Sequence, residues 1–103
     1  MKKVQLNKED INELENIINC LQSEDDETFK LGQSLFETKY PRNLRIPLKD
    51  TYISFEEYWS NMIFKRITNQ FRNYSYDFFY YFSTNRTVEL LKLLVKSEYY
   101  VCS

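Results

Sequence analysis

An aromatic stretch at residues 74–82 constrains the fold of this chain more than any other feature. Its sequence, YSYDFFYYF, places seven aromatic rings in nine positions. Each buried aromatic side chain removes on the order of 150–250 Å² from contact with water. In a chain of 103 residues, this stretch must therefore form either the centre of the hydrophobic core or an exposed binding surface.

Length and composition indicate a single globular domain spanning residues 1–103. Domains commonly have about 100–150 residues, so a chain of this length has no room for two cores. The hydrophobic fraction of 43% lies well above that of disordered chains. The amino terminus lacks the apolar run of a secretion signal, and no segment approaches the roughly 20 apolar residues of a membrane span. These features predict a cytoplasmic protein that does not enter a membrane.

The residues that usually carry catalysis or hold metals are scarce. The chain has no histidine, which removes the usual general base and the commonest metal ligand. Its one glycine, Gly32, cannot build a phosphate-binding loop. The acidic pair Glu56 and Glu57 is explained by helix capping, and the acidic run at 24–27 by solvation. The sequence therefore predicts a protein that is not an enzyme and that uses no metal and no cofactor.

The two cysteines, Cys20 and Cys102, are predicted to be reduced thiols packed inside the domain. They stand far apart in the sequence, no CxxC spacing is present, and no secretion signal precedes them. A disulfide between them is the alternative, although nothing in the sequence favours it.

Two helices are predicted in the first forty residues. The first spans residues 7–22, where Asn7 suits the N-cap and Leu6 and Ile11 have the spacing of a hydrophobic staple. Its apolar stripe consists of Ile11, Leu14, Ile17, Ile18 and Leu21. The acidic residues 23–27 would oppose the dipole at the end of this helix, so they are assigned to a turn and to the start of a second helix. That helix reaches about Thr38, and Gly32 inside it costs about 1 kcal/mol.

Residues 40–53 are predicted to form an extended connection. Pro41 and Pro47 lack amide donors and push the residues before them out of helical geometry. A short edge strand over residues 44–48 is compatible with this connection, because apolar and polar residues alternate there.

A third helix is predicted from Ser54 to about Phe71. Ser54 and Glu57 have the spacing of a capping box, and Ile53 and Tyr58 have that of a hydrophobic staple. Its predicted buried stripe consists of Trp59, Met62, Ile63, Ile67 and Phe71.

The aromatic stretch fits either a strand or a helix by its local pattern. Alternating rings and high β-propensity favour a strand. A nine-residue strand needs partners, however, and the chain lacks an Asn-Gly or Asp-Gly hairpin signal and offers only short strand candidates at residues 2–6, 44–48 and 99–102. The helix is therefore preferred, with Phe78, Phe79 and Phe82 expected in the core.

The run DFFYYFSTNRTVELLKLLVKSE, which begins at Asp77, resembles one ankyrin-type helix-turn-helix repeat. Residues 89–94 fit the second helix of such a repeat. Arg86 stands where the family's turn has glycine, bulky rings replace its small alanines, and no second copy lies upstream. The resemblance implies an antiparallel helical hairpin over residues 76–97, without membership of the family.

The preferred fold is therefore mainly α: a single-domain bundle of four to five helices with an extended connection at residues 40–53. Its last helix, about Asn85 to Ser97, is expected at the centre, with Val88, Leu91, Leu94 and Val95 facing inward. The alternative is an α+β fold in which residues 74–82 form a central strand.

Charge is polarised along the chain. Residues 1–37 hold nine acids and four bases, whereas residues 38–103 hold six acids and ten bases. An acidic surface of this kind either aids solubility or attracts a partner protein that has a basic surface. Exposed tyrosines of the aromatic stretch are further candidate anchors, because tyrosine is enriched at interface hot spots. The candidate partner-binding residues are Glu9, Asp10, Glu13, Glu24, Asp25, Asp26, Glu27, Tyr74 and Tyr76.

The competing functional hypothesis uses the basic half of the chain to bind nucleic acid. Basic residues interleaved with tyrosines would follow a phosphate backbone and leave rings free to stack on bases. The candidate residues are Arg42, Arg45, Lys65, Arg66, Arg72 and Arg86. The acidic pI of about 5.5 and the lack of a continuous basic run place this hypothesis second.

The preferred function is a small non-catalytic inhibitor that binds another protein. The partner would be a nuclease-type toxin, neutralised by an immunity protein, or a nucleic-acid-binding defence complex, blocked by a phage-encoded inhibitor. Small size, absent catalytic chemistry and charge polarity support this expectation. The lack of alanine, typical of AT-rich genes of low-GC bacteria and mobile elements, agrees with it. A structural subunit that oligomerises through its tyrosines is a third possibility.

Overall fold

The computed structural model describes the backbone of residues 1–71 and 77–102, and the side chains of residues 1–63 and 85–102. The element order is β1 (Lys2–Gln5), α1 (Lys8–Leu21), α2 (Asp26–Lys39), β2 (Arg45–Leu48), β3 (Thr51–Ser54), α3 (Glu56–Phe71), α4 (Asp77–Ser97) and β4 (Tyr99–Cys102).

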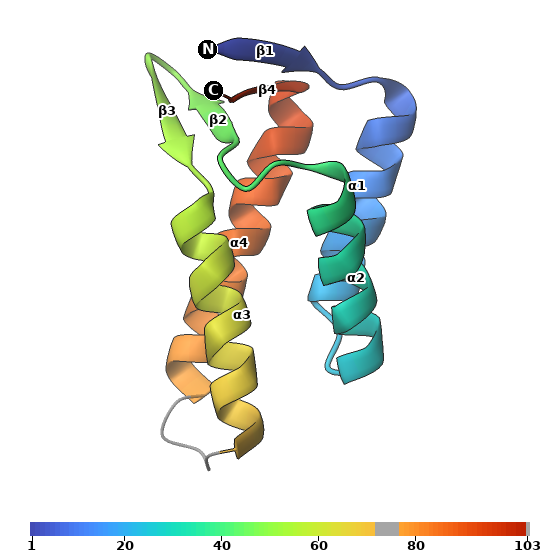
Figure 1. The fold of residues 1–103 in the computed structure, drawn as a ribbon, viewed down its shortest axis with the longest axis vertical. Coiled ribbons are helices and arrows are strands. Elements are labelled where there is room, and N and C mark those ends of the chain that lie inside the picture. Colours follow the sequence, from blue (N-terminus) through green and yellow to red (C-terminus); the bar gives the residue numbers. More distant parts are fainter. Residues whose placement is uncertain (72–76, 103) are drawn as a thin grey trace.

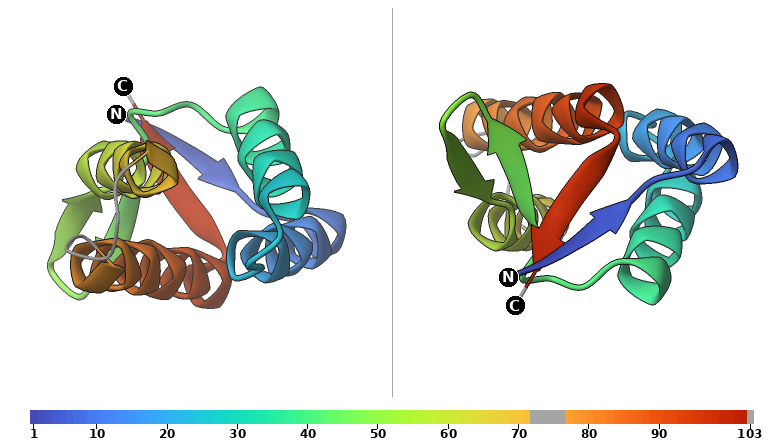
Figure 2. Two further views of the ribbon diagram at one scale, coloured as in Figure 1. Left: turned by 90° about the horizontal axis from the view of Figure 1, so that it is seen from below. Right: turned by 90° about the horizontal axis from the view of Figure 1, so that it is seen from above.

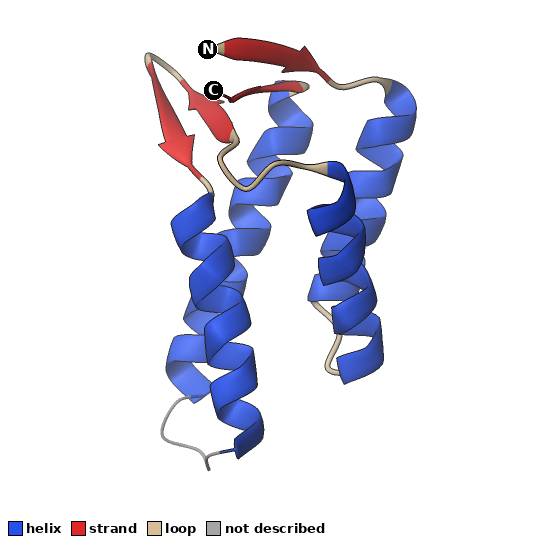
Figure 3. Cartoon of the chain, in the orientation of Figure 1, coloured by secondary structure: helices blue, strands red, loops and turns tan. Residues whose placement is uncertain are grey.

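Two antiparallel helix pairs stand side by side, and a sheet lies across one end of both (Figures 1 and 2). One pair is α1 with α2, the other is α3 with α4, and α1 also packs on α4. The four strands have the order β1-β4-β2-β3, and neighbouring strands are antiparallel. Figure 3 shows the strands gathered at this single end of the helices. The architecture is therefore α+β, and the predicted bundle is correct only for its four helices.

The sheet is built from segments that the sequence shows only as short candidates. The candidates at residues 2–6, 44–48 and 99–102 are confirmed as β1, β2 and β4. The predicted extended connection is instead a hairpin of β2 and β3, with Lys49 in the turn at a positive φ of 49°. Lysine rarely adopts this left-handed conformation, and the turn contains neither the glycine nor the asparagine that usually identifies a hairpin. The hairpin was therefore not recognisable from the sequence.

The first helix is confirmed, including its predicted cap. The Asn7 side chain accepts a hydrogen bond from the Asp10 N–H at 2.8 Å, and the Asp10 carboxylate accepts one from the Asn7 N–H at 3.0 Å. This reciprocal capping box satisfies two amide donors that would otherwise lack partners at the helix start. The predicted stripe is buried at Leu14, Ile17, Ile18 and Leu21, with Ile11 packed at its edge.

The second helix is also confirmed, but Gly32 has a packing role. A Cβ built at Gly32 would lie 2.6 Å from the Cβ of Cys20, closer than real Cβ contacts allow. Gly32 therefore lets α2 approach α1 at the point where the two helices touch. Glycine lowers the stability of a helix interior, but here it allows close packing between two helices.

The third helix begins one residue later than its capping box predicts. Ser54 closes β3, α3 starts at Glu56, and the Trp59 N–H donates to the Phe55 carbonyl at 3.1 Å. Pairing of β3 with β2 fixes the backbone of Ser54 in an extended form, which overrides its capping preference. Trp59 and Met62 are buried as predicted, whereas the side chains of Ile67 and Phe71 lie outside the described residues.

The helix preferred for the aromatic stretch is confirmed over residues 77–82, whereas the predicted helix-turn-helix hairpin within residues 76–97 is wrong. Residues 77–97 form one continuous helix, so neither a central strand at 77–82 nor a turn near Arg86 is present. The reason is local, because residues 83–86 contain no glycine or proline that would stop a helix. The antiparallel helical hairpin is instead formed by α3 and α4. Residues 74–76 and the side chains of Phe78, Phe79 and Phe82 lie outside the described residues.

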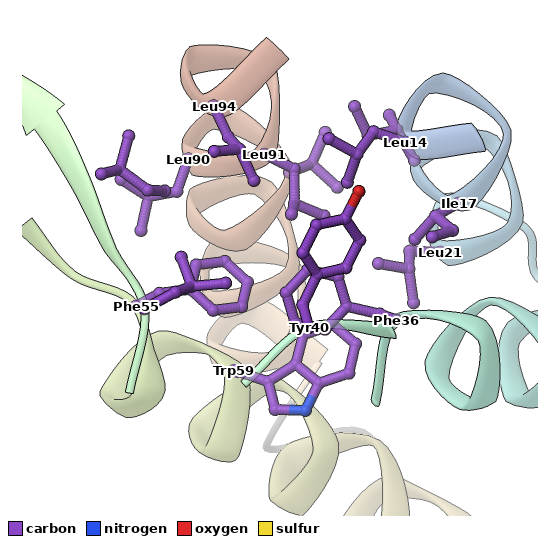
Figure 4. Close-up of a cluster of buried hydrophobic side chains, with 14 of the residues drawn as sticks. Leu14, Ile17, Leu21, Phe36, Tyr40, Phe55, Trp59, Leu90, Leu91 and Leu94 are labelled. Carbon is purple, nitrogen blue, oxygen red and sulfur yellow. The ribbon is translucent and has the colours of Figure 1, made fainter. Parts of the chain in front are cut away.

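The core lies where the helix pairs and the sheet meet (Figure 4). Phe36, Phe55 and Trp59 form its aromatic centre, with Phe36 4.6 Å from Trp59 and 5.1 Å from Phe55 between ring centroids. The carboxyl-terminal half of α4 supplies Val88, Leu90, Leu91 and Leu94 to the same core, with Val95 partly buried, which confirms its central position. Cys20 and Cys102 are both free thiols. Over the part of the chain that the structure describes, no helix has the length and apolar character needed to cross a membrane.

Candidate functional site

The predicted acidic residues occupy two places that lie at opposite ends of α1 (Figure 1). Asp10 and Glu13, with the exposed Glu9, lie near the sheet, where α1 begins. The run Glu24–Glu27 forms the turn between α1 and α2 and the start of α2. Since α1 has 14 residues, the two places are about 20 Å apart along its axis. The sequence predicted one acidic surface, and the structure divides it into two.

At the sheet end, the carboxylates hold two helices together. The Lys39 Nζ atom lies 2.6 Å from an Asp10 carboxylate oxygen and 2.7 Å from a Glu13 carboxylate oxygen. The hydrogen bond from Lys39, together with the Asn7 N–H, lowers the pKa of Asp10. The hydrogen bonds to Asp10 and then Glu13 raise the pKa of Lys39. Two of the predicted partner-binding acids therefore share one counter-charge, supplied by the last residue of α2.

The next residue, Tyr40, places a buried hydroxyl group with no hydrogen-bond partner beside this ion pair. Only 5% of the Tyr40 surface is exposed, and its ring is 5.8 Å from the Tyr100 ring in an edge-on contact. Figure 4 shows the hydroxyl pointing toward Leu14. Burial raises the pKa of Tyr40 to about 12 and also raises the pKa of Tyr100. This end of the molecule is thus organised for packing and charge neutralisation.

At the other end, the acidic turn presents its carboxylates to solvent. All four residues from Glu24 to Glu27 are exposed. Asp25 is the N-cap of α2, and its carboxylate accepts from the Thr28 N–H at 3.0 Å and from the Thr28 hydroxyl at 2.6 Å. Asp26 and Glu27 lie in the first turn of α2, where negative charge is favourable. The turn therefore combines a structural cap with exposed negative charge.

An exposed leucine lies one helical turn beyond this acidic run. Leu31 is 55% exposed on α2 and has the i,i+4 spacing from Glu27 that places both on one side of the helix. Leu31 could not be identified from the sequence, because an isolated leucine in a helical segment is usually a core residue. We define the acidic turn surface as Glu24–Glu27 together with Leu31.

The predicted tyrosine anchors are not described by the structure. Tyr74 and Tyr76 lie outside the described residues. Helix α3 ends, and helix α4 begins, on the same side of the molecule as the α1–α2 turn (Figure 1).

The predicted nucleic-acid-binding residues are not brought together where they are described. Arg42 forms an ion pair with Glu37 at 3.1 Å, and the Arg86 guanidinium lies 5.6 Å from the centre of the Tyr58 ring. Arg45 is the first residue of β2. Lys65 and Arg66 have side chains outside the described residues, and Arg72 is entirely outside them. The basic surface predicted from the carboxyl-terminal half is therefore not assembled by the described residues.

The structure also reveals a contact between a cation and an aromatic ring that sequence reasoning missed. The Lys3 Nζ atom lies 4.4 Å from the centre of the Tyr99 ring, although these residues stand near opposite ends of the chain. Only the pairing of β1 with β4 brings them together.

Within the part of the chain that is described, no group of three or more His, Cys, Asp or Glu side chains is placed to hold a metal ion. Comparison of the chain with protein-family models, with characterised proteins and with solved structures gave no significant match.

Proposed function

We propose that this protein is a small non-catalytic inhibitor that binds a basic partner protein through its acidic turn surface. The partner would be an enzyme that acts on or binds nucleic acid, since such enzymes carry a positive groove for phosphates. An immunity protein against a nuclease-type toxin is the first form of this proposal. A phage-encoded inhibitor of a defence complex is the second.

The exposure of the run Glu24–Glu27 at one end of the molecule is the observation that carries the proposal. Four consecutive acidic residues on a protruding turn give a local negative potential that attracts a positive surface and speeds the encounter. Leu31 adds exposed apolar area beside this charge, which a partner can cover once it has docked.

The acids at the sheet end support the proposal less than the sequence suggests. Lys39 already offsets one of the two negative charges of Asp10 and Glu13, so their charge is not available to a partner at full strength. Glu9 remains exposed, but it lies at the far end of α1 from the acidic turn. The proposed surface is therefore narrower than the predicted set of residues.

The test is a double charge reversal, Glu24→Lys with Glu27→Lys, which leaves the Asp25 cap in place. Wild type and variant would be used to capture proteins from the native host, and the captured protein would be measured for its rate of association with each. We expect the variant to associate roughly tenfold or more slowly at low salt, and the difference to shrink as salt is raised. For a captured nuclease, added wild-type protein should also block cleavage of a labelled substrate.

Glu89→Lys provides a matched control, because it reverses an exposed acid on α4 away from the acidic turn. This variant should associate at the wild-type rate. Equal association rates for wild type and the double reversal would show that the acidic turn does not recognise the partner. Circular dichroism of each variant would establish that the helices are retained.

A further inference from the structure

The face of the sheet that points away from the helices carries rings and cations. Because successive side chains in a strand alternate between faces, the strand register assigns each residue to one face. The row that faces the helices is Val4, Tyr100, Ile46 and Ile53, all packed on the core. The two outward rows are Lys3, Val101, Arg45 and Ser54, followed by Gln5, Tyr99, Pro47 and Tyr52.

The outward rows form a continuous surface that is separate from the core. Val101 is only 5% exposed, yet it lies outside the core cluster, between its cross-strand neighbours Lys3 and Arg45. Tyr52 is 41% exposed, and Tyr99 is half-buried with the Lys3 ammonium group over its ring. The surface therefore places two tyrosine rings in one row and two cations in the next.

Charge on the sheet differs in sign from the charge of the whole protein. The four described strands contain the cations Lys2, Lys3 and Arg45 and no acidic residue. Asp50 in the β2–β3 turn is next to Lys49, and Glu98 precedes β4. The acidic turn lies at the end of α1 away from the sheet (Figure 1), about 20 Å along the helix axis. Since charges are screened over about 8–10 Å at physiological salt, the acidic turn does not cancel the cations of the sheet.

We propose that this outward face of the sheet binds single-stranded nucleic acid. Unpaired bases would stack on Tyr99 and Tyr52, which are two strand spacings apart, about 10 Å. The phosphates between them would meet Lys3 and Arg45 in the neighbouring row. A single strand fits this face better than a duplex, because only unpaired bases expose their rings to a flat aromatic surface. This site is distinct from the acidic turn surface and does not depend on it.

The test is fluorescence anisotropy with labelled oligo(dT) and oligo(U) of about 12 nucleotides, within the usual site sizes of roughly 4–16 nucleotides. We expect both to bind at about 50 mM salt more tightly than a duplex of the same length, and to weaken at about 200 mM. Tyr52→Ala should weaken binding roughly fivefold or more through the loss of one stacking platform. Arg45→Gln should reduce the salt dependence by about 0.7 in the logarithmic slope, the value for one phosphate contact.

Lys92→Gln is the matched control, because it removes an exposed cation on α4 that is not part of the sheet. It should bind oligo(dT) like the wild type. The proposal is overturned if the wild type binds no oligonucleotide at low salt, or if Tyr52→Ala binds as tightly as the wild type. If poly-glutamate displaced the labelled strand as effectively as unlabelled oligo(dT), the occupant would be an acidic protein segment. That result would also overturn the proposal. None of these outcomes alters the charge-reversal result expected at the acidic turn. The inhibitor proposal and the nucleic-acid proposal can therefore be rejected independently.

Discussion

The two ends of the α1–α2 helix pair carry similar acidic residues, but their surroundings differ. At the sheet end, Asp10 and Glu13 are bound to Lys39 within 2.7 Å, beside the buried Tyr40. At the turn end, residues 24–27 are exposed and continue into an exposed leucine. An acidic residue in the sequence is therefore not evidence of a binding surface until its neighbours in the fold are known. The sheet end should respond to substitution mainly by losing stability, and the turn end mainly by losing a partner.

The largest expected effect is at the sheet end, at alkaline pH. The pKa of Tyr40 is about 12 in the folded chain and about 10 in the unfolded chain, so the unfolded chain loses this proton first. The contribution of neutral Tyr40 to the free energy of unfolding is fully present below pH 10 and is lost as the pH rises to 12. This loss amounts to about 2–3 kcal/mol relative to Tyr40→Phe, which has no proton to lose there. Urea unfolding of both proteins between pH 9 and 12 would measure it.

At neutral pH, the same variant tests whether the buried hydroxyl is costly. Tyr40→Phe removes a buried oxygen that has no hydrogen-bond partner, so we expect it to raise the free energy of unfolding by about 1 kcal/mol. A loss of stability in Tyr40→Phe would contradict the assignment of this hydroxyl as unpartnered.

The second effect concerns the contact that joins the two helices between these ends. Gly32→Ala would bring a Cβ to 2.6 Å from the Cβ of Cys20, so we expect it to destabilise the protein by about 1–2 kcal/mol even though alanine favours helix. Thermal unfolding would measure the loss. Adding Cys20→Ala should not restore stability, because the Cβ remains, whereas the exposed Ser34→Ala should be neutral or slightly stabilising. A stabilised Gly32→Ala would show that the helices have room to separate.

The third effect is removal of the shared cation at the sheet end. Lys39→Met leaves Asp10 and Glu13 close together without a counter-charge, and we expect a loss of about 0.5–1 kcal/mol, as for partly exposed ion pairs. Because the pKa of Asp10 is lowered, its contribution is present above the ordinary carboxylate pKa and disappears as the pH falls below about 4. Unfolding of wild type and variant at pH 7 and pH 2 should therefore differ at the first pH and converge at the second. Arg42→Met, whose ion pair is more exposed, should have the smaller effect.

The smallest effect on stability is expected at the acidic turn. Glu24→Gln with Glu27→Gln should change the free energy of unfolding by no more than about 0.5 kcal/mol, the usual range for exposed substitutions. Chemical denaturation of the double variant would measure this change. A large loss would mean that the turn holds the helices together as the sheet end does, and the contrast between the two ends would disappear.

Helix starts and apolar stripes could be predicted because they depend on residues close together in the sequence. Asn7 caps α1 as predicted, and the stripe from Leu14 to Leu21 is buried as predicted. The aromatic stretch could not be resolved in this way, because its rings suit either a strand or a helix and its predicted turn had no residue that stops a helix. Its helix continues from Asp77 to Ser97.

Candidate site residues were predicted less well, because charge in a sequence does not show its neighbours. The acidic run 24–27 is exposed in agreement with its prediction, whereas Asp10 and Glu13 are both bound to a lysine that stands 26 residues beyond Glu13. Leu31 was missed because only its exposure distinguishes it from a core residue.

The sequence by itself determined the first three helical segments, the reduced cysteines and the polarity of charge along the chain. Tertiary structure alone decided that β1 pairs with β4 at one edge of the sheet, although the two strands are far apart in the sequence, and that Lys3 therefore lies against Tyr99. The physical reason is the range of the forces involved. A helix satisfies its backbone hydrogen bonds within four residues, but a strand needs a partner that the local sequence cannot specify.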